Sequence, residues 1–310
     1  MSQPAPSAPS PGPVRWLNNQ PYILLTLTSL FWAGNIVLAR HVAGHVPPLT
    51  LSCLRWYGTF LILLPFAWPH LKRDWPVLRA HLPLLLLLSV LGFAYNNAIS
   101  FWAMQYTEAL NALLIQSAGP LFVAVWTLAF GVRLTGAQLA GIAISLVGVL
   151  TIILRGDWSA LAGIRFNRGD LMFGSSLVAF GLYSALMLRR PVTHPLSLIS
   201  FTTCCGATML VPFSIWEYST GVTLQPDAIS LATLAYVIVF PSTLAYTFFN
   251  RGIALIGPNR AAPFFHLVPV FGSAMAILLL GEQLRLYHLA GYALVLAGVV
   301  IASRRAAAKA

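Results

Sequence analysis

Three polar side chains lie deep within long apolar stretches of the sequence, where they could bind a solute or carry a proton. Asn35 and Asn97 each sit in an apolar run, and because a buried amide without a partner is costly, each should face another helix or a wet cavity. His266 lies in a third such run. Its imidazole could carry a proton or donate to a substrate, or it could be a neutral group bonded to a neighbouring helix.

Membrane-spanning helices are the elements that would position these side chains. Of the 310 residues, 58% are hydrophobic and 8% are charged, whereas about a quarter of the residues in a soluble domain are charged. A bilayer core requires about 20 mostly apolar residues per helix. Nine runs contain no Asp, Glu, Lys or Arg: 16–39, 80–107, 109–132, 134–154, 171–188, 191–216, 228–250, 261–281 and 286–303. A tenth span, from Pro47 to Trp68, is interrupted only by Arg55. We therefore predict an all-α integral membrane protein with ten transmembrane helices.

Basic residues predict how these helices are oriented. With the N-terminus inside, the inner loops hold twelve Lys and Arg residues and the outer loops hold five, as expected when basic loops face the cytoplasm. Both termini are therefore predicted to be cytoplasmic. The net charge of +11 is then explained by loops that face an anionic leaflet of the lipid bilayer, so no nucleic acid is expected as a partner.

A five-helix unit occurs twice in the chain. The segment from Leu139 to Gly148 recurs 150 positions later, from Leu289 to Gly298, with its glycines in place. An odd number of helices per unit inverts the second copy, and inverted repeats are typical of transporters that bind solute near the bilayer midplane. We predict a disordered tail (1–15), a first repeat (16–155), an extracytoplasmic linker (156–167), a second repeat (168–303) and a cytoplasmic C-terminal tail (304–310).

Several short motifs occur along both halves of the chain. They are Trp32-Ala33-Gly34-Asn35, Leu54-Arg55-Trp56, Ala103 to Thr107, Pro120-Leu121-Phe122, Gly169-Asp170-Leu171, Tyr183-Ser184-Ala185, Pro269-Val270-Phe271 and Leu280-Gly281-Glu282. These motifs resemble the drug/metabolite transporter superfamily and, within it, the EamA-type exporters. The resemblance covers about residues 21–303 and is closest to bacterial aromatic amino-acid exporters. The sequence departs from the family at Gly131-Val132, where the usual pair is Gly-Glu.

The resemblance implies that the first, third, fourth, sixth, eighth and ninth helices line the substrate path in a bacterial inner membrane. Arg55 is expected to extend toward the surface, so the midplane lining would be uncharged and would suit a zwitterionic aromatic amino acid. For each ring, packing is the alternative. The candidate binding residues are Trp32, Asn35, Tyr95, Asn97, Phe101, Asn111, Gln116, Phe180, Tyr183, Tyr246, Phe249, Asn250, Phe264 and His266, and the candidate hinges are Pro120 and Pro269.

Energy coupling and the competing enzyme class complete the expectations. The sequence contains no Walker-type phosphate loop and no carboxylate relay within the predicted spans, which favours a facilitative carrier, with proton coupling through His266 as the alternative. The cysteines fall inside predicted helices, so no metal or cofactor is expected, and a monomer and a homodimer are both open. Gly174-Ser175-Ser176 with His266 could form an intramembrane serine protease, although that function leaves the repeat unexplained. Other small metabolites or drugs remain alternative substrates.

Overall fold

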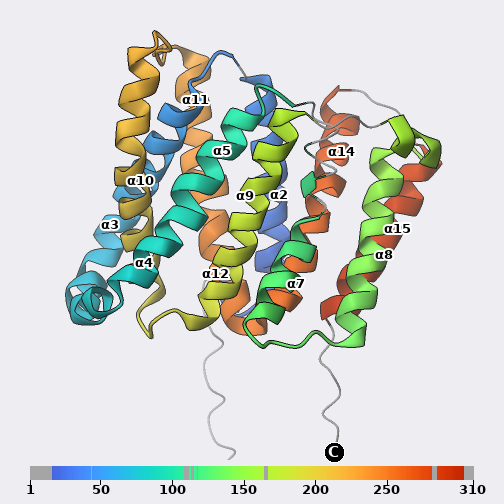
Figure 1. The fold of residues 1–310 in the computed structure, drawn as a ribbon, viewed down its shortest axis with the longest axis horizontal. Helices are drawn as coiled ribbons and strands as arrows, with labels where there is room; N and C mark the ends of the chain where they lie inside the picture. The colour runs from blue at the N-terminus through green and yellow to red at the C-terminus, as the bar shows by residue number, and fades with distance from the viewer. Residues whose placement is uncertain are drawn as a thin grey trace, which may run out of the picture.

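A computed structural model describes residues 16–42, 44–107, 112, 115, 116, 118–163, 167–280 and 285–303. These residues form a bundle of roughly aligned helices (Figure 1). Candidate residue Asn111 and the predicted tails 1–15 and 304–310 lie outside the described residues.

The helices differ in length and regularity. The uninterrupted long helices are α2 (Pro21–His41), α3 (Pro48–Ala80), α9 (Arg168–Leu186) and α10 (Pro195–Ser219). Two further rods are composite: α4 (Leu82–Ser89), η1 (Val90–Tyr95) and α5 (Asn96–Ala103) form one, and α11 (Ala228–Val237), η4 (Ile238–Leu244) and α12 (Ala245–Ile256) form the other. The remaining elements are α7 (Gly119–Ala129), α8 (Gly136–Ile153), η2 (Trp158–Gly163), η3 (Met187–Arg189), α13 (Pro258–Ala261), η5 (Ala262–His266), α14 (Leu267–Leu280) and α15 (Leu286–Ser303).

By length and composition, six stretches of the described chain could cross a membrane, and α7, α8 and α15 are shorter apolar helices. The predicted all-helical membrane fold is therefore confirmed at this level. The count of ten spans stays a prediction.

Helices α3 and α10 run antiparallel and cap each other's first turns. The Glu217 carboxylate at the end of α10 accepts hydrogen bonds from the backbone N–H groups of Leu49 (3.1 Å) and Thr50 (2.7 Å), where α3 begins. At the opposite end, Asp74 of α3 accepts from the backbone N–H of His194 (2.7 Å), just before α10. A carboxylate near a helix N-terminus satisfies free N–H groups and is favoured by the helix dipole. This reciprocal capping holds the two longest helices in register.

A glycine seam joins α8 to α15, which lie side by side at one edge of the bundle (Figure 1). A Cβ built on Gly141 would lie 2.5 Å from the Gly298 carbonyl oxygen, and one on Gly148 would lie 2.8 Å from that of Gly291. Small residues allow such close backbone approach. The repeated glycines noted in the sequence therefore pack against each other within one chain, with the two helices antiparallel.

At the centre of the bundle, one helix of each half of the chain packs against two other helices in a similar way. Helix α2 packs against α12 and α14, and α9 packs against α5 and α7. Each composite rod contains a π-helical turn, η1 in one and η4 in the other. A π-helical turn inserts an extra residue, which changes the side-chain register and is frequent at functional sites. The two turns therefore mark the region where the substrate site is expected.

Candidate functional site

A cavity lies among α2, α3, α5, α9, α12 and η5. Its volume is about 90 Å³, several times the roughly 10–15 Å³ that one water molecule needs. Both halves of the chain contribute to it. The lining residues are Trp32, Asn35, Ile36, Ala39, Arg55, Asn96, Asn97, Ser100, Phe101, Met104, Gln116, Phe173, Leu177, Phe180, Tyr246 and Phe265.

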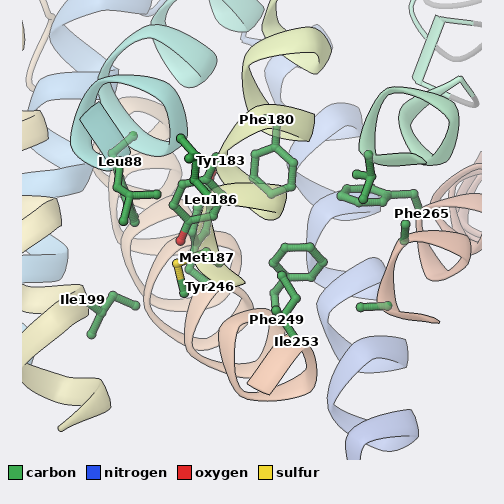
Figure 2. Packing of buried hydrophobic residues seen from close by; sticks show 14 of the residues in the cluster. Leu88, Phe180, Tyr183, Leu186, Met187, Ile199, Tyr246, Phe249, Ile253 and Phe265 are labelled. Carbon is green, nitrogen blue, oxygen red and sulfur yellow. The ribbon is translucent and has the colours of Figure 1, made fainter. Parts of the chain in front are cut away.

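Aromatic rings from α2, α9 and η5 form one wall of this cavity. Trp32 of α2 stacks on Phe265 of η5 with ring centroids 5.3 Å apart and an interplanar angle of 14°. Phe180 of α9 meets both rings edge-on, at 5.6 Å and 5.5 Å. Figure 2 shows Phe180, Phe249 and Phe265 close together at the centre of the bundle. Such a wall offers ring faces and edges to an apolar or aromatic solute.

Tyr246 and two amides form a polar network beside the rings. The Tyr246 hydroxyl donates to the Gly92 carbonyl oxygen (2.8 Å) in η1 and accepts from Asn97 Nδ2 (3.1 Å). Asn96 Nδ2 lies 3.4 Å from the same hydroxyl. Because a π-helical turn disturbs the regular backbone ladder, its carbonyl groups need other donors. Side chains of α12 and α5 provide them, and this fixes the polar side of the cavity.

Arg55 gives the cavity a positive charge, and the expected uncharged lining was wrong. Its side chain is 1% exposed and lines the cavity instead of reaching the surface. Nε donates to Ser242 Oγ at 2.7 Å, and the guanidinium lies 4.8 Å from the Trp56 ring centroid and 5.5 Å from that of Phe101. The long helix α3 carries Arg55 into the bundle, where η4 holds it.

Seven of the candidate binding residues line this one cavity. They are Trp32, Asn35, Asn97, Phe101, Gln116, Phe180 and Tyr246. The sequence alone could place them on helices but could not show that they share a cavity.

Other candidates lie outside the residues that line the cavity. The Tyr183 hydroxyl donates to Asn250 Oδ1 (2.9 Å), and the Phe249 ring lies 5.4 Å from that of Phe180. Tyr95 is 41% exposed, and its hydroxyl lies 2.8 Å from Ser175 Oγ.

Phe264 and His266 flank Phe265 in the 3₁₀ turn η5 and are not among the residues that line the cavity. Phe264 stacks on Tyr22 with centroids 6.1 Å apart, and His266 Nδ1 contacts Ser145 Oγ of α8. Phe265, between them, is the residue that lines the cavity. A 3₁₀ turn advances each side chain by about 120° instead of 100°, so the α-helical spacing could not identify the lining ring.

The candidate hinges and the candidate protease pair were also located. Pro120 lies in the first turn of α7 and Pro269 in the first turn of α14, where a missing backbone N–H is tolerated. The Ser176 hydroxyl donates to the Phe173 carbonyl oxygen of its own helix (2.6 Å), whereas His266 contacts Ser145. The serine and histidine thus have different partners.

Sequence reasoning missed several lining residues, of which Arg55 matters most. A charged residue inside an otherwise apolar span is a functional signal by default, and that signal was available in the sequence. Asn96 and Phe265 each lie next to a candidate residue, in α5 and η5, and were not among the candidates.

Comparison with known proteins gives a consistent family and fold. The model of the EamA-like transporter family matches residues 20–154 and 167–304. The "Uncharacterized transporter YyaM" of Bacillus subtilis is 29% identical over 289 residues, covering 91% of this chain and 93% of the relative. A "Probable amino-acid metabolite efflux pump" of Salmonella typhimurium is 29% identical (90% and 93% covered), and one of Escherichia coli is 28% identical with the same coverage. A crystal structure at 17% identity aligns with a TM-score of 0.70, covering 91% of this chain and 96% of that chain, which supports the fold alone.

Proposed function

Because the chain belongs to the EamA-like transporter family, we propose that it exports small neutral or zwitterionic metabolites, foremost aromatic and other neutral amino acids. The observation that carries this proposal is the cavity that both halves line with rings and polar groups. The relatives named as probable amino-acid metabolite efflux pumps support the same substrate class. The family is one of transporters and not of enzymes.

The lining chemistry supports this choice of substrate. Trp32, Phe180 and Phe265 can contact an apolar or aromatic side chain, whereas Asn97 and Gln116 offer directed hydrogen bonds. Small-molecule sites commonly combine mostly apolar walls with a few placed polar groups. The described lining residues include no Asp, Glu or Lys, which disfavours organic cations and gives no carboxylate for proton coupling.

Alternating access would follow from two inverted five-span halves. In this proposal the spans are α2, α3, α4–α5, the segment ending in α7, α8, α9, α10, α11–α12, α13–α14 and α15, in repeats 16–155 and 168–303. The antiparallel pairs α3–α10 and α8–α15 support the inversion. Rocking about the central site would expose it to each side in turn, with Pro120 and Pro269 as hinges.

Location and orientation complete the proposal. A 23% identical relative is named an uncharacterized inner membrane transporter, which supports placing the protein in a bacterial cytoplasmic membrane. The excess of Lys and Arg in alternate loops of the sequence predicts that both termini are inside. Tags at the two ends, probed with an impermeant reagent in intact spheroplasts, should both be protected. Labelling of one end alone would contradict an even number of spans.

A liposome flux assay tests the substrate class. Purified protein should release labelled phenylalanine and tryptophan down their gradients, equally with and without an imposed pH gradient. Glucose, inorganic phosphate and tetraethylammonium should stay inside, and protein-free liposomes are the control. Release of phosphate or the cation without phenylalanine would refute the proposed substrate, and acceleration by a pH gradient would refute facilitative transport.

A further inference from the structure

We propose that Arg55 binds the carboxylate of the transported solute and that Asn35 accepts a hydrogen bond from its ammonium group. This inference rests on the proposed function and assigns an orientation to the bound solute. It starts from two side chains that line the same cavity, each with one buried polar atom that has no hydrogen-bond partner among the described residues.

Arg55 is a buried cation without an anionic partner among the described residues. Its side chain is 1% exposed, and Nη1 is buried with no hydrogen-bond partner there. Among the described residues, the ion pairs join His45 to Asp227 and Arg73 to Asp74, and neither pair involves Arg55. A buried, uncompensated charge is strongly unfavourable. A ligand anion in the cavity would remove this penalty.

The geometry around Arg55 favours a carboxylate. Ser242 in η4 holds Nε at 2.7 Å, and the rings of Trp56 and Phe101 lie beside the guanidinium. These contacts hold the guanidinium in place, and Nη1 has no hydrogen-bond partner among the described residues. The planar guanidinium matches the two oxygens of a carboxylate. Phosphate also suits arginine, but the cavity is mostly apolar, and Arg55 is the one Arg or Lys among its described lining residues. A monoanionic group on an apolar body fits better than a dianion.

Asn35 supplies the second recognition element. Its Oδ1 is buried and has no hydrogen-bond partner in the described part of the chain. An unsatisfied buried carbonyl oxygen needs a donor, and the ammonium group of an amino acid is a strong one. A cation at Arg55 and an acceptor at Asn35, with rings at Trp32 and Phe265, complement the three parts of an aromatic zwitterion.

A series of solutes tests the idea on the wild-type protein. Competition against labelled phenylalanine in liposome counterflow should be strong for phenylalanine and for tryptophan. Phenylalaninamide and 2-phenylethylamine, which lack the carboxylate, should compete at least tenfold more weakly. 3-Phenylpropanoate, which lacks the ammonium group but keeps the carboxylate, should compete less strongly than phenylalanine but more strongly than phenylalaninamide and 2-phenylethylamine. Equal competition by phenylalanine and phenylalaninamide would overturn the assignment of Arg55.

Matched variants separate recognition from folding. Arg55→Gln should raise KM for phenylalanine at least tenfold and should leave inhibition by 2-phenylethylamine unchanged, so that selectivity for the carboxylate is lost. Arg251→Gln is the control, because Arg251 donates to Asn18 and Asn19 away from the cavity, and it should retain wild-type selectivity. A structural role for Arg55 would lower transport of all solutes in proportion, and that result would refute the proposal.

Two further variants keep the test decisive. If Arg55→Gln does not purify as a folded protein, Arg55→Lys should retain preference for the carboxylate with a raised KM, and loss of that preference would refute the proposal. Asn35→Leu should weaken the binding of phenylalanine more than the binding of 3-phenylpropanoate. Equal weakening of both would refute the assignment of Asn35. Wild-type protein that moves no amino acid would refute the proposed function itself, whereas transport without carboxylate selectivity would refute this inference alone.

Discussion

Replacing Glu217 by glutamine should destabilise the fold measurably. Its carboxylate is 5% exposed and accepts three hydrogen bonds at the start of α3: from the Leu49 N–H (3.1 Å), the Thr50 N–H (2.7 Å) and the Thr50 hydroxyl (2.7 Å). Glutamine has one acceptor oxygen, so its NH₂ group would face a backbone N–H. Hydrogen bonds to charged groups contribute about 1.5–3 kcal/mol each, and a charge at a helix terminus adds about 0.3–1 kcal/mol.

We therefore expect Glu217→Gln to cost about 2–4 kcal/mol, or one charged hydrogen bond plus the dipole interaction. At about 2–4 °C per kcal/mol, the apparent melting temperature in detergent should fall by at least about 4 °C, followed by tryptophan fluorescence at a fixed heating rate. The control is Asp157→Asn, because the exposed Asp157 accepts only from Ser159 among the described contacts. If the Glu217→Gln and Asp157→Asn variants had the same apparent melting temperature, the capping argument for the α3–α10 pair would be refuted.

Three further predictions concern packing, binding and pH. Gly298→Val should lower the melting temperature, because its Cβ would lie 2.5 Å from backbone atoms of α8, whereas Gly136→Ala, with open space around it, should not; equal melting would contradict the seam. Trp32→Ala should raise KM for phenylalanine about tenfold, equivalent to about 1.4 kcal/mol, and the 52% exposed Trp68 serves as the matched alanine control. Burial, with nearby positive charge, lowers the pKa of His194, so the unfolded chain protonates first as pH falls through about 6.5. The contribution of His194 to stability should therefore be fully present above this pH and be lost as the pH falls from about 6.5 to 5.5. The decline should be smaller in His194→Gln, and an identical decline would exclude His194 as the cause.

The sequence alone determined the class of fold. Charge-free runs of about 20 residues can satisfy their backbone only as helices in a bilayer, and the structure is helical over the described residues. The repeated glycines from Gly141 to Gly298 are also visible in the sequence, and in the structure they form the α8–α15 seam. These features follow from local composition and spacing, so they can be read without tertiary contacts.

Only the tertiary structure decided which side chains meet at the site. From the sequence, Phe264 was expected to line the site and Arg55 to extend toward the surface. In the structure, Phe265 of the 3₁₀ turn lines the cavity, and Ser242 of η4 holds Arg55 inside it. Turns that depart from the 3.6-residue period rotate every later side chain. Whether a long charged side chain extends to the surface or bonds across the bundle depends on a partner, Ser242, that lies 187 residues away in the sequence.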